Sequence, residues 1–298
     1  MTTSLTNNES TFQKIVRLLR WHKPAGRLIL MLPALWATVA AAKTQHQLPP
    51  LDLLGVVILG SLATSAAGCV INDLWDRDID PQVDRTKTRP LAERSLSIQV
   101  GIAVLLVAGL CAFLLSTYLN PLSFGLCFAA VPVIAIYPAC KRFFPVPQLV
   151  LSIAWGFAVL IPWSAVTGGL DRYAWELWTA VIAWTMGFDT IYAMSDRTDD
   201  LKVGVKSSAL FFGRYVTFAI AIFLAIALGC LIWLGWEIQL GYAHYFACLT
   251  AGVIWIWQCN RLSQTEIPSE LYQKAFGQNV WIGFIILAGM LPSALSIG

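Results

Sequence analysis

The chain has 298 residues, of which 57% are hydrophobic and only 12% are charged, and its formal net charge at pH 7 is +3. A mean hydropathy of +0.67 excludes an ordinary water-soluble domain. A net charge this small also argues against nucleic-acid binding. We therefore expect a chain that lies in a lipid bilayer as one packed helical bundle.

The first residues are the most polar part of the chain. We expect residues 1–13 to form a disordered tail, and residues 14–298 to form a single domain. Residues 14–23 are typical of a short helix at the membrane surface, because Ile15, Leu18 and Leu19 fall along one side of it.

Nine apolar segments follow, and each is long enough to cross a hydrocarbon layer of ~30 Å, which takes roughly 20 residues. They are residues 25–43, 51–72, 98–118, 121–138, 147–168, 173–194, 211–235, 239–260 and 276–296. Pro33, Pro132 and Pro162 lie inside three of them, and membrane helices tolerate such interruptions. The sequence thus predicts an all-α polytopic membrane protein with nine transmembrane helices.

The basic residues predict how this bundle is oriented. With the N-terminus in the cytoplasm, 18 of the 20 Lys and Arg residues lie on the cytoplasmic side, and only Lys43 and Arg172 lie outside. The C-terminus then lies on the outer side. We expect the whole chain to reside in a bacterial inner (plasma) membrane. The longer polar stretches, residues 73–97, 139–147, 195–210 and 261–275, all face the cytoplasm and predict a cap on that side.

Carboxylates are concentrated in two short stretches, residues 72–80 and 189–200, which together hold eight of the seventeen in the chain. Each stretch closes an apolar segment that runs toward the cytoplasm. If the helices continue through them, Asp73, Asp76 and Asp80 share one helical face. By the same spacing, a second face carries Asp189, Tyr192, Asp196 and Asp200, with Asp199 at its edge.

Like charges this close repel one another, and a divalent cation removes the repulsion. Mg²⁺ in particular prefers a few carboxylates together with water and phosphate oxygens. Basic residues follow each acidic stretch, namely Arg77, Arg85, Lys87, Arg89, Arg197, Lys202 and Lys206. Carboxylates, magnesium and cations beside a membrane interior indicate a substrate that is a diphosphate with a lipid-like tail.

Three other interpretations fit the sequence less well. One acidic stretch alone is typical of a solvated helix end, but two matching stretches with adjacent cations are not. A secondary transporter would place its carboxylates near the middle of the membrane in broken helices, whereas these close helices at the cytoplasmic edge. A purely structural membrane protein has no use for two such clusters.

Both acidic stretches match known motifs. The first, Asn72-Asp73-x-x-Asp76-x-x-x-Asp80, resembles the first motif of the UbiA superfamily of intramembrane prenyltransferases. The second, Asp189-x-x-Tyr192-Ala193-Met194-x-Asp196-Arg197-x-Asp199-Asp200, resembles the second motif. The Tyr-Ala-Met-x-Asp-Arg string, Lys23-Pro24-x-Gly26 and Tyr137-Pro138-x-x-Lys141-Arg142 are similar to the 4-hydroxybenzoate polyprenyltransferase branch.

The resemblance implies nine helices around a central cavity with a cytoplasmic cap. It also implies Mg²⁺-dependent transfer of a polyprenyl group from polyprenyl diphosphate to 4-hydroxybenzoate, in ubiquinone or plastoquinone biosynthesis. The residues it assigns to magnesium are Asp73, Asp76, Asp80, Asp196, Asp199 and Asp200. Those it assigns to substrates are Asn72, Arg85, Lys87, Arg89, Tyr192, Lys202 and Lys206, with Arg142 as the partner of the benzoate carboxylate.

The residue roles in catalysis follow from the chemistry of an allylic diphosphate. Asp76 and Asp196 would hold the metal that neutralises the leaving group, and Asp189 would polarise the phenol. Trp155, Trp163, Trp184 and Phe188 are candidates for shielding the carbocation. Homogentisate, dihydroxynaphthoate, chlorophyllide and haem precursors stay open as acceptors. One departure from the family pattern is Arg27, where an uncharged residue is common.

Overall fold

The computed structural model describes residues 9–264 and 267–296. Regular structure in these ranges is entirely helical. The elements are α1 (Thr11–Leu18), α2 (Ala25–Thr44), α3 (Leu51–Trp75), η1 (Asp80–Gln82), α4 (Ile98–Ser116), α5 (Pro121–Cys140), α6 (Pro147–Thr167), α7 (Arg172–Met194), α8 (Arg197–Val203), α9 (Ser208–Phe212), η2 (Gly213–Tyr215), α10 (Val216–Glu237), α11 (Gly241–Leu262) and α12 (Ser269–Leu295).

Nine helices in the described residues have 19 or more residues each, and each coincides with a predicted apolar segment. Seven helical stretches are long and apolar enough to cross a membrane, and the α10 stretch extends back to Ser208. The other two long helices, α7 and α11, are more polar. Asp189 interrupts the apolar face of α7, and His244 and Gln258 lie inside α11. The chain is thus an integral membrane protein, and nine spans stay a prediction.

The N-terminal boundary differs from the prediction. Helix α1 begins at Thr11, so residues 11–13 are helical and not part of a tail, while residues 1–8 lie outside the described part of the chain. A capping box explains the earlier start: the Ser10 side chain accepts from the Gln13 N–H, and the Gln13 side chain accepts from the Ser10 N–H. The helix ends at Leu18, before Lys23.

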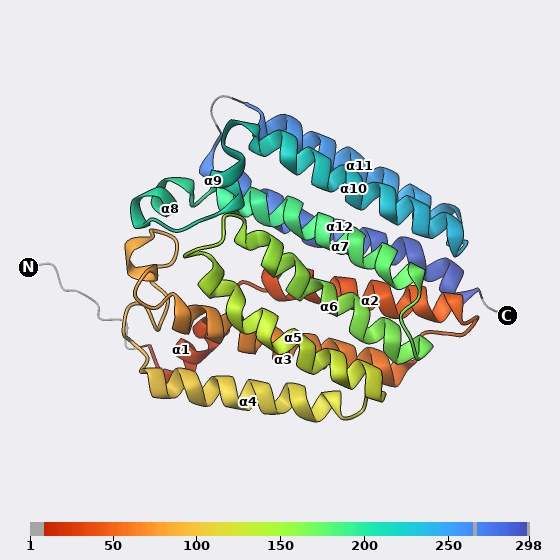
Figure 1. Cartoon of the computed structure of the whole chain (residues 1–298), viewed down its shortest axis with the longest axis horizontal. Coiled ribbons are helices and arrows are strands. Elements are labelled where there is room, and N and C mark those ends of the chain that lie inside the picture. Colours follow the sequence, from red (N-terminus) through yellow and green to blue (C-terminus); the bar gives the residue numbers. More distant parts are fainter. Residues whose placement is uncertain (1–8, 265–266, 297–298) are drawn as a thin grey trace, which may run out of the picture.

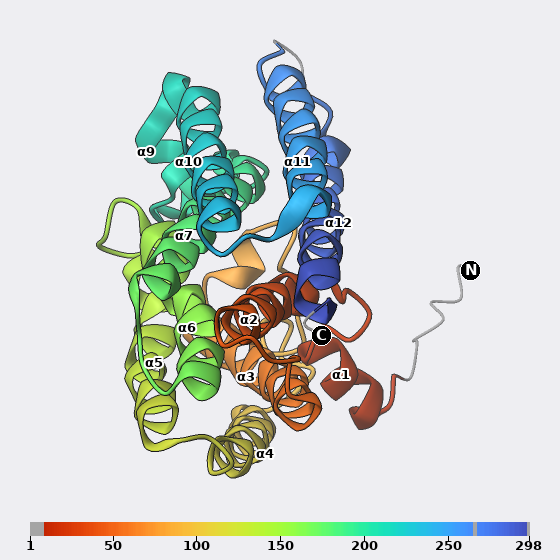
Figure 2. The ribbon, with the colours of Figure 1, turned by 90° about the vertical axis from the view of Figure 1, so that its right-hand side faces the viewer.

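The long helices run side by side, and the longer connections gather at one end of the bundle (Figure 1). These connections carry η1, α8 and α9, while the opposite end has short turns. Viewed along the bundle, α2 lies in the middle, between α6, α3 and α12, and α4 lies outermost, beside α3 (Figure 2). Helix α4 packs on α3 and has little contact with α5.

The bundle has two halves that differ in packing. Helices α2, α7, α10, α11 and α12, together with part of α6, share the main hydrophobic core, and we call them the packed half. Asn279 of α12 joins them, because its Oδ1 accepts from the indole N–H groups of Trp184 and Trp255, both at 2.9 Å. Helices α3, α4 and α5 have few buried residues, and we call them the open half.

Both acidic stretches lie where a helix stops, so the expectation that helix continues through them was wrong. Helix α3 ends at Trp75, Asp76 caps it, and Asp80 begins η1. Helix α7 ends at Met194, and Asp196 precedes α8. Pro81 prevents the helix from resuming through residues 77–80, because proline has no N–H to donate and its ring blocks helix in the preceding turn. Turns, not helical faces, bring these acids together.

Candidate active site

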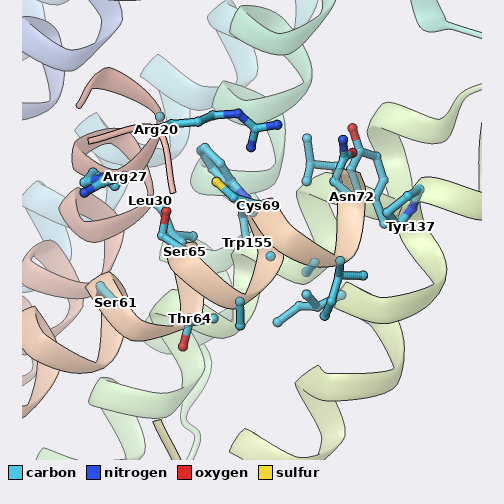
Figure 3. A pocket seen from close by; sticks show the side chains of 18 of the residues that line it. Arg20, Arg27, Leu30, Ser61, Thr64, Ser65, Cys69, Asn72, Tyr137 and Trp155 are labelled. Atoms are coloured by element: carbon cyan, nitrogen blue, oxygen red, sulfur yellow. The ribbon is translucent and has the colours of Figure 1, made fainter. Parts of the chain in front are cut away.

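A cavity of about 1240 Å³ opens among α2, α3, α5, α6, α7 and α12, at the end that carries the long connections. Figure 3 shows part of its lining, with Asn72 of α3 beside Tyr137 of α5. Both acidic stretches reach this cavity. The predicted site residues that line it are Asn72, Asp73, Asp76, Asp80, Arg85, Arg89, Asp189, Tyr192, Asp196, Asp200 and Lys206.

The carboxylates of the first stretch are almost wholly buried: Asp73 is 1% exposed, Asp76 3% and Asp80 4%. Each is held by a cation. Arg89 Nη1 lies 3.1 Å from Asp73 Oδ1 and 2.8 Å from Asp80 Oδ2, and Lys141 Nζ lies 2.7 Å from Asp76 Oδ2. Buried carboxylates are unfavourable unless paired in this way, so the ion pairs account for the burial.

Arg85 joins the two acidic stretches. It follows the first in sequence, yet its Nε donates to Asp196 Oδ1 at 2.9 Å and its Nη1 donates to the Tyr192 hydroxyl at 3.0 Å. Its guanidinium also lies 4.8 Å from the centre of the Tyr192 ring. A planar guanidinium suits such a fork of acceptors. The two stretches therefore face one space, as the sequence predicted.

Burial changes the acidity of carboxyls outside the predicted spans. It raises the pKa of Asp80 above its usual value, although Arg89 works against the shift. Burial also raises the pKa of Asp200 to about 6, with an opposing hydrogen bond from Ser207. A carboxyl with a raised pKa gains most from a cation that neutralises it.

The acidic stretches fit a divalent metal in their donor chemistry. Among the described residues no group of three or more His, Cys, Asp or Glu side chains is already gathered as a metal cluster. Arg89 bridges Asp73 and Asp80, and Lys141 pairs with Asp76. Asp76 Oδ1 is nevertheless buried without a hydrogen-bond partner. Arg142 Nη1 lies 3.9 Å from this oxygen. A carboxylate oxygen without a hydrogen bond is the donor type that Mg²⁺ prefers.

Four predicted residues lie outside the cavity lining. Lys87 pairs with Asp84 at 2.8 Å and Lys202 pairs with Asp199 at 3.2 Å, both near the surface. Asp199 Oδ2 also accepts from the Asp84 N–H at 3.3 Å. These groups fasten the connections to one another and do not reach the buried carboxylates in this structure.

Arg142 is the fourth of these residues. Its Nη2 donates to the Trp75 carbonyl at 2.7 Å, and its guanidinium lies 5.7 Å from the centre of the Trp75 ring. Its neighbour Lys141 lines the cavity in its place. Both follow the end of α5, where one residue of difference turns the side chain by about 100°. The sequence could not say which of the two faces inward.

The aromatic lining also differs from the prediction. Of the four residues proposed to shield a cation, only Trp155 lines the cavity; Trp163, Trp184 and Phe188 are buried in the core. Tyr137, which the sequence indicated only as part of a motif, and Phe276, which it did not indicate, also line the cavity. Phe276 lies 4.9 Å from Tyr192 between ring centres.

Two arginines before and in α2 were missed or left open. Arg20 lies in the connection between α1 and α2, with a left-handed φ of 57°, and its Nη2 lies 2.5 Å from Asp73 Oδ1. Arg27 lies in the first turn of α2, lines the cavity and is only 7% exposed. In the sequence both arginines look like the ordinary positive charges that flank a first membrane span. Only the structure shows that their side chains reach the cavity.

Comparisons with known proteins agree with this arrangement. The chain is 63% identical over 277 residues to a Synechocystis protein named 4-hydroxybenzoate solanesyltransferase, covering 93% of this chain and 94% of the relative. It is 41% identical over 276 residues to a 4-hydroxybenzoate octaprenyltransferase of Azoarcus, covering 92% and 94%.

Solved structures share the fold. A UbiA homologue of Aeropyrum pernix has a TM-score of 0.77 at 24% identity, covering 89% of this chain and 97% of that one. A homologue of Archaeoglobus fulgidus bound to GPP and Mg²⁺ has a TM-score of 0.67 at 19% identity, covering 92% and 99%. The model of the UbiA prenyltransferase family matches residues 30–291. With its two acidic motifs facing one cavity, the chain belongs to the UbiA prenyltransferase family.

Proposed function

We propose that the chain is a Mg²⁺-dependent 4-hydroxybenzoate polyprenyltransferase. It transfers the polyprenyl group of a polyprenyl diphosphate to position 3 of 4-hydroxybenzoate, in the biosynthesis of ubiquinone- or plastoquinone-type quinones. The observation that carries the proposal is the cavity lined by both acidic stretches, in which Arg85, five residues after the first stretch, binds Asp196 of the second. The names of the Synechocystis and Azoarcus relatives support the choice of substrates.

The donor binds at the end of the cavity that holds the buried acids. The residues that would hold Mg²⁺ are Asp73, Asp76, Asp80, Asp196 and Asp200, with Asp199 at the rim. Bound there, the metal supplies positive charge that stabilises the departing diphosphate. Asn72, Arg85, Arg89, Lys141 and Lys206 line the same end and bind the phosphate oxygens. Lys87 and Lys202, at the surface, add positive charge where the diphosphate enters.

The transfer breaks one bond and forms another. The allylic C–O bond breaks, the diphosphate leaves with the electron pair, and an allylic carbocation remains. Trp155, Tyr137 and Phe276 line the cavity beside it, so their π faces stabilise the cation and exclude water. The ring carbon ortho to the phenol then forms the new C–C bond, and the ring proton leaves to the diphosphate or a carboxylate. Asp189, on α7, accepts from the phenol.

The arrangement in the bilayer follows from the same residues. We infer nine spans, with α7 and α11 crossing among more apolar neighbours, and a single domain over residues 14–298. The connections that carry η1, α8 and α9 then form a cytoplasmic cap, with the N-terminus inside and the C-terminus outside, in a bacterial inner membrane. The distribution of Lys and Arg supports this orientation.

The test uses the purified full chain with a labelled prenyl diphosphate, Mg²⁺ and one acceptor at a time. We expect 3-polyprenyl-4-hydroxybenzoate from 4-hydroxybenzoate, identified by mass spectrometry, and none after EDTA is added. Product from homogentisate or dihydroxynaphthoate alone would change the acceptor but keep the reaction. No product from any acceptor would contradict the proposal.

A further inference from the structure

Arg27 differs from every other buried cation that lines the cavity. Arg20, Arg85, Arg89 and Lys141 each lie within 4.0 Å of a carboxylate of the two acidic stretches. Arg27 is only 7% exposed, yet no carboxylate in the described part of the chain lies within 4.0 Å of its guanidinium. A buried positive charge without an acid is unfavourable, and in a membrane protein it marks a functional site.

The contacts of Arg27 fix its position but leave its charge unmatched. Its Nη2 donates to the Leu19 carbonyl at the end of α1, and its guanidinium lies 4.0 Å from the centre of the Trp21 ring. Both partners are neutral. They use one edge and one face of the guanidinium, so the remaining N–H groups are available to a ligand in the cavity.

The position of Arg27 separates it from the donor end. Figure 3 shows Arg27 on the opposite side of the pocket from Asn72 and Tyr137, with Ser61 and Ser65 of α3 also on its side. The basic end that binds phosphates and this second basic point therefore lie at two ends of one space. A ligand with a single negative charge and a flat ring fits between them.

We propose that Arg27 binds the carboxylate of the aromatic acid acceptor, an inference that rests on the proposed function. The guanidinium fork matches a carboxylate in geometry, and burial strengthens the pairing. The acid supplies the missing negative charge, so the acceptor completes an ion pair that the chain itself leaves open. Anchoring the acid at this end turns the phenol end of the ring toward the donor.

The other cations are less suited to this role. Arg142 donates to the Trp75 carbonyl outside the cavity lining. Arg20 is occupied by Asp73. His22 and Lys23 also line the cavity, but their side chains are exposed, so a carboxylate there would stay hydrated and gain little.

The experiment measures Arg27→Gln and Arg27→Lys in the full-length protein. In Arg27→Gln we expect the KM for 4-hydroxybenzoate, and the inhibition constant of benzoate, to rise about 10- to 100-fold. The KM for the prenyl diphosphate should change less than threefold. Arg27→Lys should lie between the two, because it keeps the charge and loses the fork.

Two further variants separate this role from a structural one. Lys23→Gln removes an exposed charge from the same connection and should change the acceptor KM less than threefold. Trp21→Leu removes the ring on which the Arg27 guanidinium lies, and it leaves Arg27 and its positive charge in place. If Arg27 only fastens α1, Trp21→Leu and Arg27→Gln should lower Tm alike and leave the acceptor KM unchanged, and that result would overturn the proposal.

Binding of benzoate, followed as the rise in Tm that it causes, keeps the inference independent of turnover. Wild type should show the rise, and Arg27→Gln should lose it while benzamide affects neither. An unchanged rise in Arg27→Gln, or its loss in Arg142→Gln instead, would contradict the assignment. If wild type binds benzoate through Arg27 but transfers no prenyl group to 4-hydroxybenzoate, the proposed function fails and the binding site stands.

Discussion

The packed half and the open half invert the usual relation between apolar sequence and burial. In α4, with a mean hydropathy of 2.6 over its most apolar stretch, 11% of that stretch is buried, whereas in α2, at 1.6, 67% is buried. Helix α4 is therefore the more apolar of the two and the more outward-facing. In a bilayer this is the expected arrangement, because lipid solvates apolar side chains as well as a protein core does.

The same comparison explains where the chemistry lies. The packed half holds polar groups inside, and some of them pair with each other, as Asn279 does with two indoles. The open half contributes small residues and space, and both halves contribute one acidic stretch to the cavity between them. In this chain a highly apolar helix thus indicates a surface that faces lipid, and polar residues within a long helix indicate a face that points into the bundle.

The largest effect should come from two single substitutions, each of which removes one cavity acid, one beside the open half and one beside the packed half. Asp76→Ala, beside α3, and Asp196→Ala, beside α7, should each lower turnover by about 10²- to 10³-fold, because in the proposed function both carboxylates hold the metal that stabilises the leaving group. Product formation measured by mass spectrometry checks this, with folding followed by size-exclusion chromatography. Asp78→Ala is the control, since Asp78 is exposed and pairs with Arg94. Full activity in either cavity variant would refute the metal role.

A second comparison concerns stability. In the packed half, a Cβ on Gly289 would lie 2.6 Å from Ala247 Cβ and 3.0 Å from the Ala243 carbonyl oxygen, so Gly289→Ala should destabilise the fold by about 1–3 kcal/mol. In the open half nothing lies within 4 Å of a Cβ on Gly60. Gly60→Ala should be neutral or stabilising by up to about 1 kcal/mol, because alanine favours helix.

The midpoint of thermal unfolding in detergent measures both glycine variants. Equal shifts in Tm would show that the two halves are packed alike, against the structure.

The smallest effect is a dependence on pH. The carboxyl of Asp200, with its pKa raised to about 6, is ionised above that pH and protonated below it. Mg²⁺ needs the ionised form, so its affinity should fall up to about tenfold per pH unit as the pH drops through this range. The Mg²⁺-induced rise in Tm at pH 5.5 and 7.5 measures the difference. Asp200→Asn should bind more weakly and lose this step; a step of unchanged size would assign it to another group.

The sequence predicted the helices better than it predicted the site. Apolar length located all nine long helices, because crossing a bilayer demands it. The sequence also placed the two acidic stretches together, but for the wrong reason. It assumed that each stretch was helical, whereas turns at the helix ends bring the acids together. Which of Lys141 and Arg142 faces inward depends on where α5 ends, and such boundaries are set by tertiary packing. The backbone of Arg20 adopts a left-handed conformation on the way to Asp73, and no pattern in the sequence predicts that conformation.

The ion pairs of the cavity have a consequence for how substrate arrives. Arg20, Arg89 and Lys141 already neutralise the acids that would hold a metal. If magnesium and a diphosphate bind there as proposed, these side chains would be free to pair with the phosphates instead. Such an exchange of counter-ions would keep the total charge of the cavity nearly constant.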